Sequence, residues 1–195
     1  MTTDLNAALE RVREYVRSKI AGGFLSIEAI EAEAVDAGSL DAPAVEVRPH
    51  VSGIVKHYIE AHLEEQATWP QETDYDRLAA AFAHLEDRGI VARQDFSCCG
   101  TCGGVEIWDE MEKVESAGPS VRGYTFFHVQ DTDTAVDGHG LYLAYGSAAE
   151  TEAGALAIAR EVVATLENSG LSAIWDGTWA KCIHVKLDWK RRREG

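Results

Sequence analysis

The densest group of chemically reactive side chains lies between Asp95 and Gly104. Cys98, Cys99 and Cys102 fall within five positions there, and the last two form a C-x-x-C pair. That spacing lets two thiolates reach one tetrahedral ion, and the three glycines of the segment let the backbone turn toward the sulfurs. We therefore predict a metal site, with zinc as the candidate ion, in the turn of a β-hairpin.

A tetrahedral zinc site needs more than the two thiolates of one C-x-x-C pair. Cys98 is one further candidate ligand, and His128 in a following strand is another. Cys182 and His184 are two residues apart, which would place them on one face of the final strand. Gln130 would share a strand face with His128, and Asp131 follows directly, so both are expected to line the same site.

Cys99 and Cys102 have a second interpretation, as a redox-active dithiol. In thioredoxin-like proteins such a pair opens a helix, whose dipole lowers the pKa of the first thiol. Here Gly103 and Gly104 follow the pair and a strand is expected next, so we expect no helix dipole to lower the pKa of Cys99. Thiols with no chemical role are the third interpretation.

Composition excludes several classes of function. The 195 residues include 18 Lys and Arg against 33 Asp and Glu, a formal net charge of −15. Nucleic acid and anionic lipid both require a basic surface, so neither is an expected partner. The only basic run, residues 190–193, is expected to be a solvated end. Because we find no apolar signal segment and no apolar run that could span a membrane, we expect a cytoplasmic protein with reduced cysteines.

Hydrophobic periodicity predicts helices first and strands later. Helices are expected at 4–20, 27–37 and about 51–66, followed by a helix at 74–88 and a long one at about 150–168. Strands are expected at 90–96, 105–108, 122–130, 141–145, 171–175 and 182–189, with loops at 109–120 and 131–140. We predict an N-terminal helical region, 1–68, and an α+β domain, 69–195.

Two segments of the second region resemble each other. Residues 85–92 and 166–173 match at an offset of 81, and each has a helix end, a glycine and the start of a strand. We interpret them as a duplicated α-β-β unit, with two more strands between the copies. One apolar stripe on each helix suits packing on one face of a mostly antiparallel sheet. The expected class is therefore α+β.

Several motifs together resemble an uncharacterised bacterial family of unknown function. They include Cys-Cys-Gly-Thr-Cys-Gly at 98–103, His-x-Gln-Asp-Thr at 128–132 and Trp-Asp-Gly at 175–177. The resemblance implies no activity. We therefore expect a small metal-binding protein, with a thiol-redox enzyme or sensor as the alternative. A protein–protein interaction module and a winged-helix regulator remain further alternatives, although the helices at 51–66 and 74–88 lack the basic face that DNA binding needs.

Overall fold

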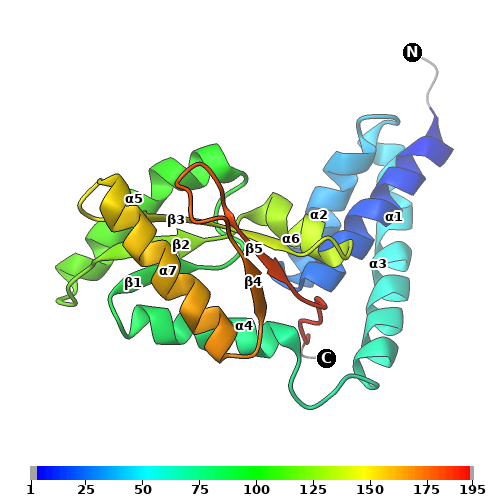
Figure 1. Cartoon of the computed structure of the whole chain (residues 1–195). Coiled ribbons are helices and arrows are strands. Elements are labelled where there is room, and N and C mark those ends of the chain that lie inside the picture. Colours follow the sequence, from blue (N-terminus) through cyan, green and yellow to red (C-terminus); the bar gives the residue numbers. More distant parts are fainter. Residues whose placement is uncertain (1–3, 194–195) are drawn as a thin grey trace. The chain divides into compact units, whose positions relative to one another are not determined.

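A computed structural model describes residues 4–193 (Figure 1). Two compact units divide the chain. The helical unit contains the residues up to Gln71 together with those from Lys190, and the α+β unit runs from Glu72 to Trp189. Each unit is described by itself below.

Three helices form the helical unit: α1 (Leu5–Gly22), α2 (Ile27–Gly38) and α3 (Ala44–Gln66). Their shared interior is aliphatic and fully buried, and Val12, Val16 and Ile20 form the apolar stripe of α1, the helix that hydrophobic periodicity predicts. Ser26 caps α2, because its hydroxyl accepts a hydrogen bond from the amide of Ala29. α3 begins earlier than predicted and includes Pro49.

The basic C-terminal run is not a solvated end. The guanidinium of Arg193 donates hydrogen bonds to the carbonyl oxygens of Lys19 at 3.0 Å, Ile20 at 2.8 Å and Leu25 at 3.1 Å. The Arg193 amide also donates to the side chain of Gln66 at 2.7 Å. A cation at these carbonyls satisfies groups that the end of α1 leaves without helical partners.

The α+β unit is built on a five-stranded mixed sheet in the order β1-β2-β3-β5-β4. Its strands are β1 (Ile90–Arg93), β2 (Gly123–Phe126), β3 (Leu141–Ser147), β4 (Ser172–Ile174) and β5 (Ile183–Lys186). β1 and β2 are parallel, and every other pairing is antiparallel. The α+β class and the mostly antiparallel sheet are therefore confirmed.

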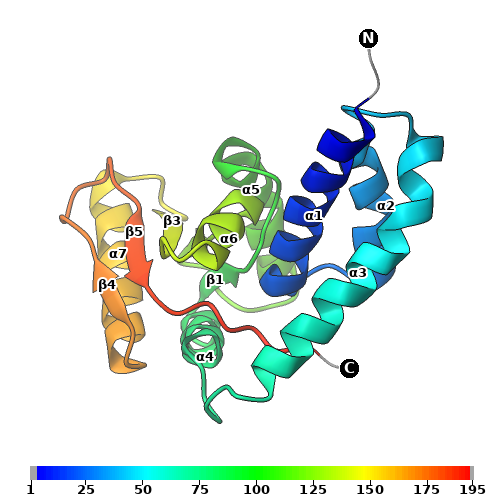
Figure 2. The ribbon, with the colours of Figure 1, turned by 90° about the vertical axis from the view of Figure 1, so that its right-hand side faces the viewer.

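Helices cover both faces of this sheet, which corrects the expectation of one covered face. α4 (Asp74–Glu86) packs with α7 (Glu152–Asn168), while α5 (Gly100–Ser116) packs with β1 and β2. A methyl group added at Gly123 would lie 2.7 Å from Ile158 of α7. One added at Gly103 of α5 would lie 2.7 Å from Phe126. Positions 123 and 126 point to opposite faces of β2, so α7 and α5 lie on opposite sides, as Figure 2 also shows.

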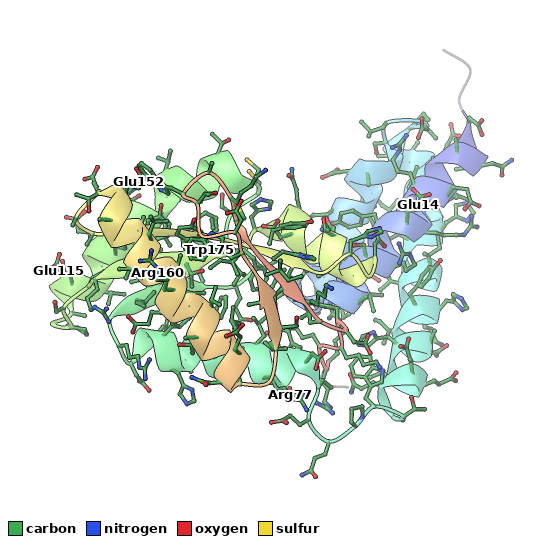
Figure 3. The ribbon with its side chains drawn as sticks, in the orientation of Figure 1. Glu14, Arg77, Glu115, Glu152, Arg160 and Trp175 are labelled. Atoms are coloured by element: carbon green, nitrogen blue, oxygen red, sulfur yellow. The ribbon has the colours of Figure 1, made fainter. Side chains whose placement is uncertain are left out.

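The polar face of α7 turns away from the sheet. Glu152 and Arg160 are exposed on that helix, and Figure 3 shows their side chains directed outward. Ile158 and Leu166 are buried on the other side of α7. This division follows from the apolar stripe of an amphipathic helix.

The predicted duplicated α-β-β unit is wrong in its first copy. α7 is followed by β4 and β5, but α4 is followed by β1 and then by helix α5. The two segments share only a helix end, a strand start and a glycine between them, Gly89 with φ of 78° and Gly170 with φ of 83°. Left-handed glycines of this kind commonly end helices, which explains the local similarity.

Candidate metal centre

The three clustered cysteines lie where β1 leads into α5. Cys99 is the N-cap residue of α5, and Cys102 lies in the first turn. The strand predicted at 105–108 and most of the loop predicted at 109–120 belong to this helix, so the expected β-hairpin is wrong. The reason is topological: β1 and β2 are parallel, and parallel neighbours require a crossover connection, most often a helix.

The three sulfur atoms lie close together. Those of Cys98, Cys99 and Cys102 are all within 4.8 Å of one another, and each thiol is free. In a tetrahedral zinc site with bonds of about 2.3 Å, neighbouring sulfurs are about 3.8 Å apart, so small side-chain rotations suffice. Cys98 is exposed and the other two are half-buried, so an ion could enter from solvent.

The start of α5 changes the acidity of these thiols. Cys99 makes no side-chain capping hydrogen bond, but the nearby amides of Cys102 and Thr101, together with the Cys102 thiol, lower the pKa of Cys99. Hydrogen bonding with Cys98 and Cys99 raises the pKa of Cys102 to about 11. The expectation that no helix terminus assists Cys99 is therefore wrong, because the C-x-x-C pair opens a helix.

The end of β2 holds the cysteine loop in place. The amide of Phe96 donates to the Phe127 carbonyl at 2.8 Å, and the amide of Val129 donates to the Ser97 carbonyl at 3.2 Å. Because β1 and β2 are parallel, their carboxyl ends meet at one edge of the sheet. The helices that follow, α5 and α6 (Val129–Val136), consequently begin beside each other.

Two residues of the cysteine loop have backbone conformations that are uncommon outside glycine. Asp95 has φ of 50° and Ser97 has φ of 64°. The hydroxyl of Thr132, which is buried in α6, donates to the carboxylate of Asp95 at 2.6 Å. Sequence reasoning missed the positioning role of these three residues. The tolerance of Asp for the left-handed region is the one local signal that could have indicated a turn at position 95.

His128 caps α6 and does not lie within a strand. Its Nδ1 accepts the amide of Asp131 at 3.3 Å, and its Nε2 lies 3.2 Å from the Asp131 carboxylate. Gln130 is exposed in the first turn of α6, so the predicted shared strand face is wrong. The signal that could have found this helix is the His-x-x-Asp spacing, which forms a capping box here.

The His128 ring lies beside the cysteine segment. A methyl group added at Gly100 would be 3.4 Å from the Nε2 of His128. Within residues 4–193, however, the group of ligand atoms that lie within 4.8 Å of one another contains the three cysteine sulfurs and no histidine nitrogen. Burial raises the pKa of the Asp131 carboxyl that holds this ring. His128 therefore stays a predicted ligand.

Cys182 and His184 lie at the start of β5, outside the close sulfur group. The His184 ring stacks on Tyr142 with 4.7 Å between centroids, and its Nε2 lies 3.0 Å from the carbonyl oxygen of His139. Burial raises the pKa of the Cys182 thiol, and the charge of Asp131 acts in the same direction. A role for this pair in the metal site stays a prediction.

Comparison with known families identifies the chain. Residues 6–193 match DUF6891, a domain of unknown function. The chain belongs to this family. Searches of curated proteins and of solved structures gave no significant match. In the described part of this DUF6891 chain, no helix has both the length and the apolar character that crossing a membrane requires.

Proposed function

We propose that this DUF6891 protein binds a thiolate-preferring metal ion, zinc in the first instance, through Cys98, Cys99 and Cys102. The observation that carries the proposal is the mutual approach of the three sulfurs within 4.8 Å while all remain free thiols. Three cysteines that share one helix start and its preceding loop are typical of a tetrahedral zinc site lacking one ligand. The amides at the start of α5 also lower the pKa of the Cys99 thiol, which favours the thiolate form that binds metal.

His128 is the fourth ligand in this proposal. Its ring is close to Gly100, but Nδ1 accepts the Asp131 amide, which assigns the ring proton to Nε2. Ligation through Nε2 therefore requires the ring to give up that capping hydrogen bond. Replacing His128 with Ala should weaken zinc binding by about tenfold or more. Unchanged affinity would show that His128 is not a ligand.

The test is a joint measurement of metal content and free thiols on the full chain, purified without chelator or nickel affinity. We expect about one zinc ion per chain, with three thiols protected from a thiol reagent until a chelator is added. Cys98→Ser should weaken binding. Cys182→Ser tests whether Cys182 takes part, and with His128 as the fourth ligand it should retain the ion. Four reactive thiols and no metal after incubation with zinc would contradict the proposal.

A dithiol redox function is the second candidate, because Cys99 is the N-cap residue of a helix whose first amides lower the pKa of its thiol. Cys98→Ser should leave such a dithiol intact, so the same variant separates the two candidates. Metal-free protein with two thiols missing would favour the redox function.

The remaining alternatives have less support. A winged-helix regulator would need a hairpin wing in the cysteine segment, but residues 100–116 form α5. An interaction module stays a prediction, as do the expectation that nucleic acid is not a partner and the expected cytoplasmic location.

A further inference from the structure

The sulfurs that would hold the metal are also close enough to react with one another. A disulfide between any two of them removes two of the three thiolates. One thiolate with the proposed ligand His128 is too small a ligand set to retain a zinc ion in a tetrahedral site. We propose that oxidation of Cys99 and Cys102 to a disulfide by hydrogen peroxide releases the metal, which makes this site a peroxide-responsive metal switch. This inference rests on the proposed metal-binding function.

The position of the pair in α5 selects Cys99 and Cys102. N-cap and third-residue side chains of a helix face each other, as they do in a capping box, so this pair can close without unwinding α5. Cys98 and Cys99 are adjacent, and the Cα atoms of adjacent residues are about 3.8 Å apart, below the usual range for disulfides.

The reaction balances as a two-electron oxidation. The Cys99 thiolate attacks one peroxide oxygen, so that an S–O bond forms, the O–O bond breaks and hydroxide leaves. The Cys102 thiolate then attacks the sulfenic sulfur, so that the S–S bond forms, the S–O bond breaks and a second hydroxide leaves. Two protons from solvent convert both hydroxides to water. The sulfurs lose two electrons, the peroxide gains them, and the zinc ion passes to solvent.

Access to the site suits this chemistry. Cys98 is exposed and its two neighbours in the group are half-buried, so a small oxidant can reach them. The loop is held by hydrogen bonds at Asp95 and Phe96. Neither residue belongs to the disulfide, so these bonds need not break when it forms. The switch is therefore local, and the fold should survive it.

The experiment titrates the zinc-loaded full chain with hydrogen peroxide. Released zinc is followed with a chromogenic chelator, and thiols are alkylated and mapped by mass spectrometry. We expect zinc and one Cys99–Cys102 disulfide to appear together, in amounts equal to the peroxide consumed, and dithiothreitol with added zinc to restore binding. Ser116→Ala, at an exposed position at the far end of α5, is the control and should behave like the unchanged chain. Cys98→Ser should still form the disulfide.

The outcomes separate the two proposals. Zinc content before peroxide is added tests the metal site, and a chain that binds no zinc overturns both proposals. A chain that binds zinc and then retains it after the Cys99–Cys102 disulfide forms overturns only the switch. Zinc release without that disulfide, or with a disulfide to Cys182, also overturns only the switch.

Discussion

Two adjacent glycines of α5 should respond in opposite ways to the same substitution. Gly103 is buried, and a methyl group there would lie 2.7 Å from the ring of Phe126. At Gly104 a methyl group would meet nothing within 4 Å. We therefore expect Gly103→Ala to destabilise the α+β unit and Gly104→Ala to stabilise it.

The pair of variants isolates the cost of the contact. Alanine is favoured over glycine in a helix by about 0.8–1.0 kcal/mol, and this gain is common to both positions. Phe126 is 1% exposed and its ring packs against those of Phe96 and Tyr124, so it has little room to move. Overpacking of this kind costs about 1–3 kcal/mol. The free energy of unfolding should therefore be lower in Gly103→Ala than in Gly104→Ala by about 1–3 kcal/mol.

Urea unfolding monitored by circular dichroism measures this difference. The two variants should have equal m values, so that a shift in the midpoint reports stability alone. Gly103→Ala should also weaken zinc binding, since displacing α5 from Phe126 moves Cys102 and the N-cap Cys99. Gly104→Ala is the matched control for that effect. If Gly103→Ala proved as stable as Gly104→Ala, close packing of Gly103 on Phe126 would not be what holds α5, and with it Cys99 and Cys102, on the sheet.

Three further predictions concern other parts of the molecule. Arg193→Ala should destabilise the helical unit, with the free energy of unfolding lowered by about 1.5–3 kcal/mol for each charged hydrogen bond that is lost without replacement. An unchanged melting curve would contradict the packing of the C-terminal run on this unit. Arg122 hydrogen-bonds the Glu161 carboxylate and lowers its pKa, so this pair should stabilise the fold above the unfolded-state pKa of about 4.3 and lose that contribution as the pH falls through the folded-state pKa. Glu161→Gln should remove this part of the pH dependence in acid unfolding curves. Thr132→Val should lose the hydrogen bond to Asp95, cost about 1.5–3 kcal/mol and speed zinc exchange in a chelator-competition assay, whereas unchanged exchange would exclude a positioning role for Thr132.

The presence and the first residues of several helices follow from local sequence signals. The stripe of Val12, Val16 and Ile20 predicts α1, and Ser26 marks the start of α2. Thr73 with Asp76 forms a capping box at the start of α4. These features depend on residues within one or two helical turns, so the pattern of apolar side chains and capping groups is enough to specify them.

The sequence also determined which residue types form the candidate site, because three cysteines within five positions are visible without a structure. It did not determine their setting. The alternation at 105–108 suits a strand, but the same residues place Ile107 on the buried side of α5, and only the neighbouring elements decide between these two arrangements.

The position of the cysteines at the start of a helix, and with it the acidity of Cys99, depends on the parallel pairing of β1 with β2. That pairing joins residues more than 30 positions apart and requires a crossover, so the cysteine segment begins a helix instead of turning a hairpin. The same pairing sets the capping residue His128 beside Gly100. Acidity of Cys99 and proximity of His128 are consequences of long-range strand pairing, which no local pattern of residues contains.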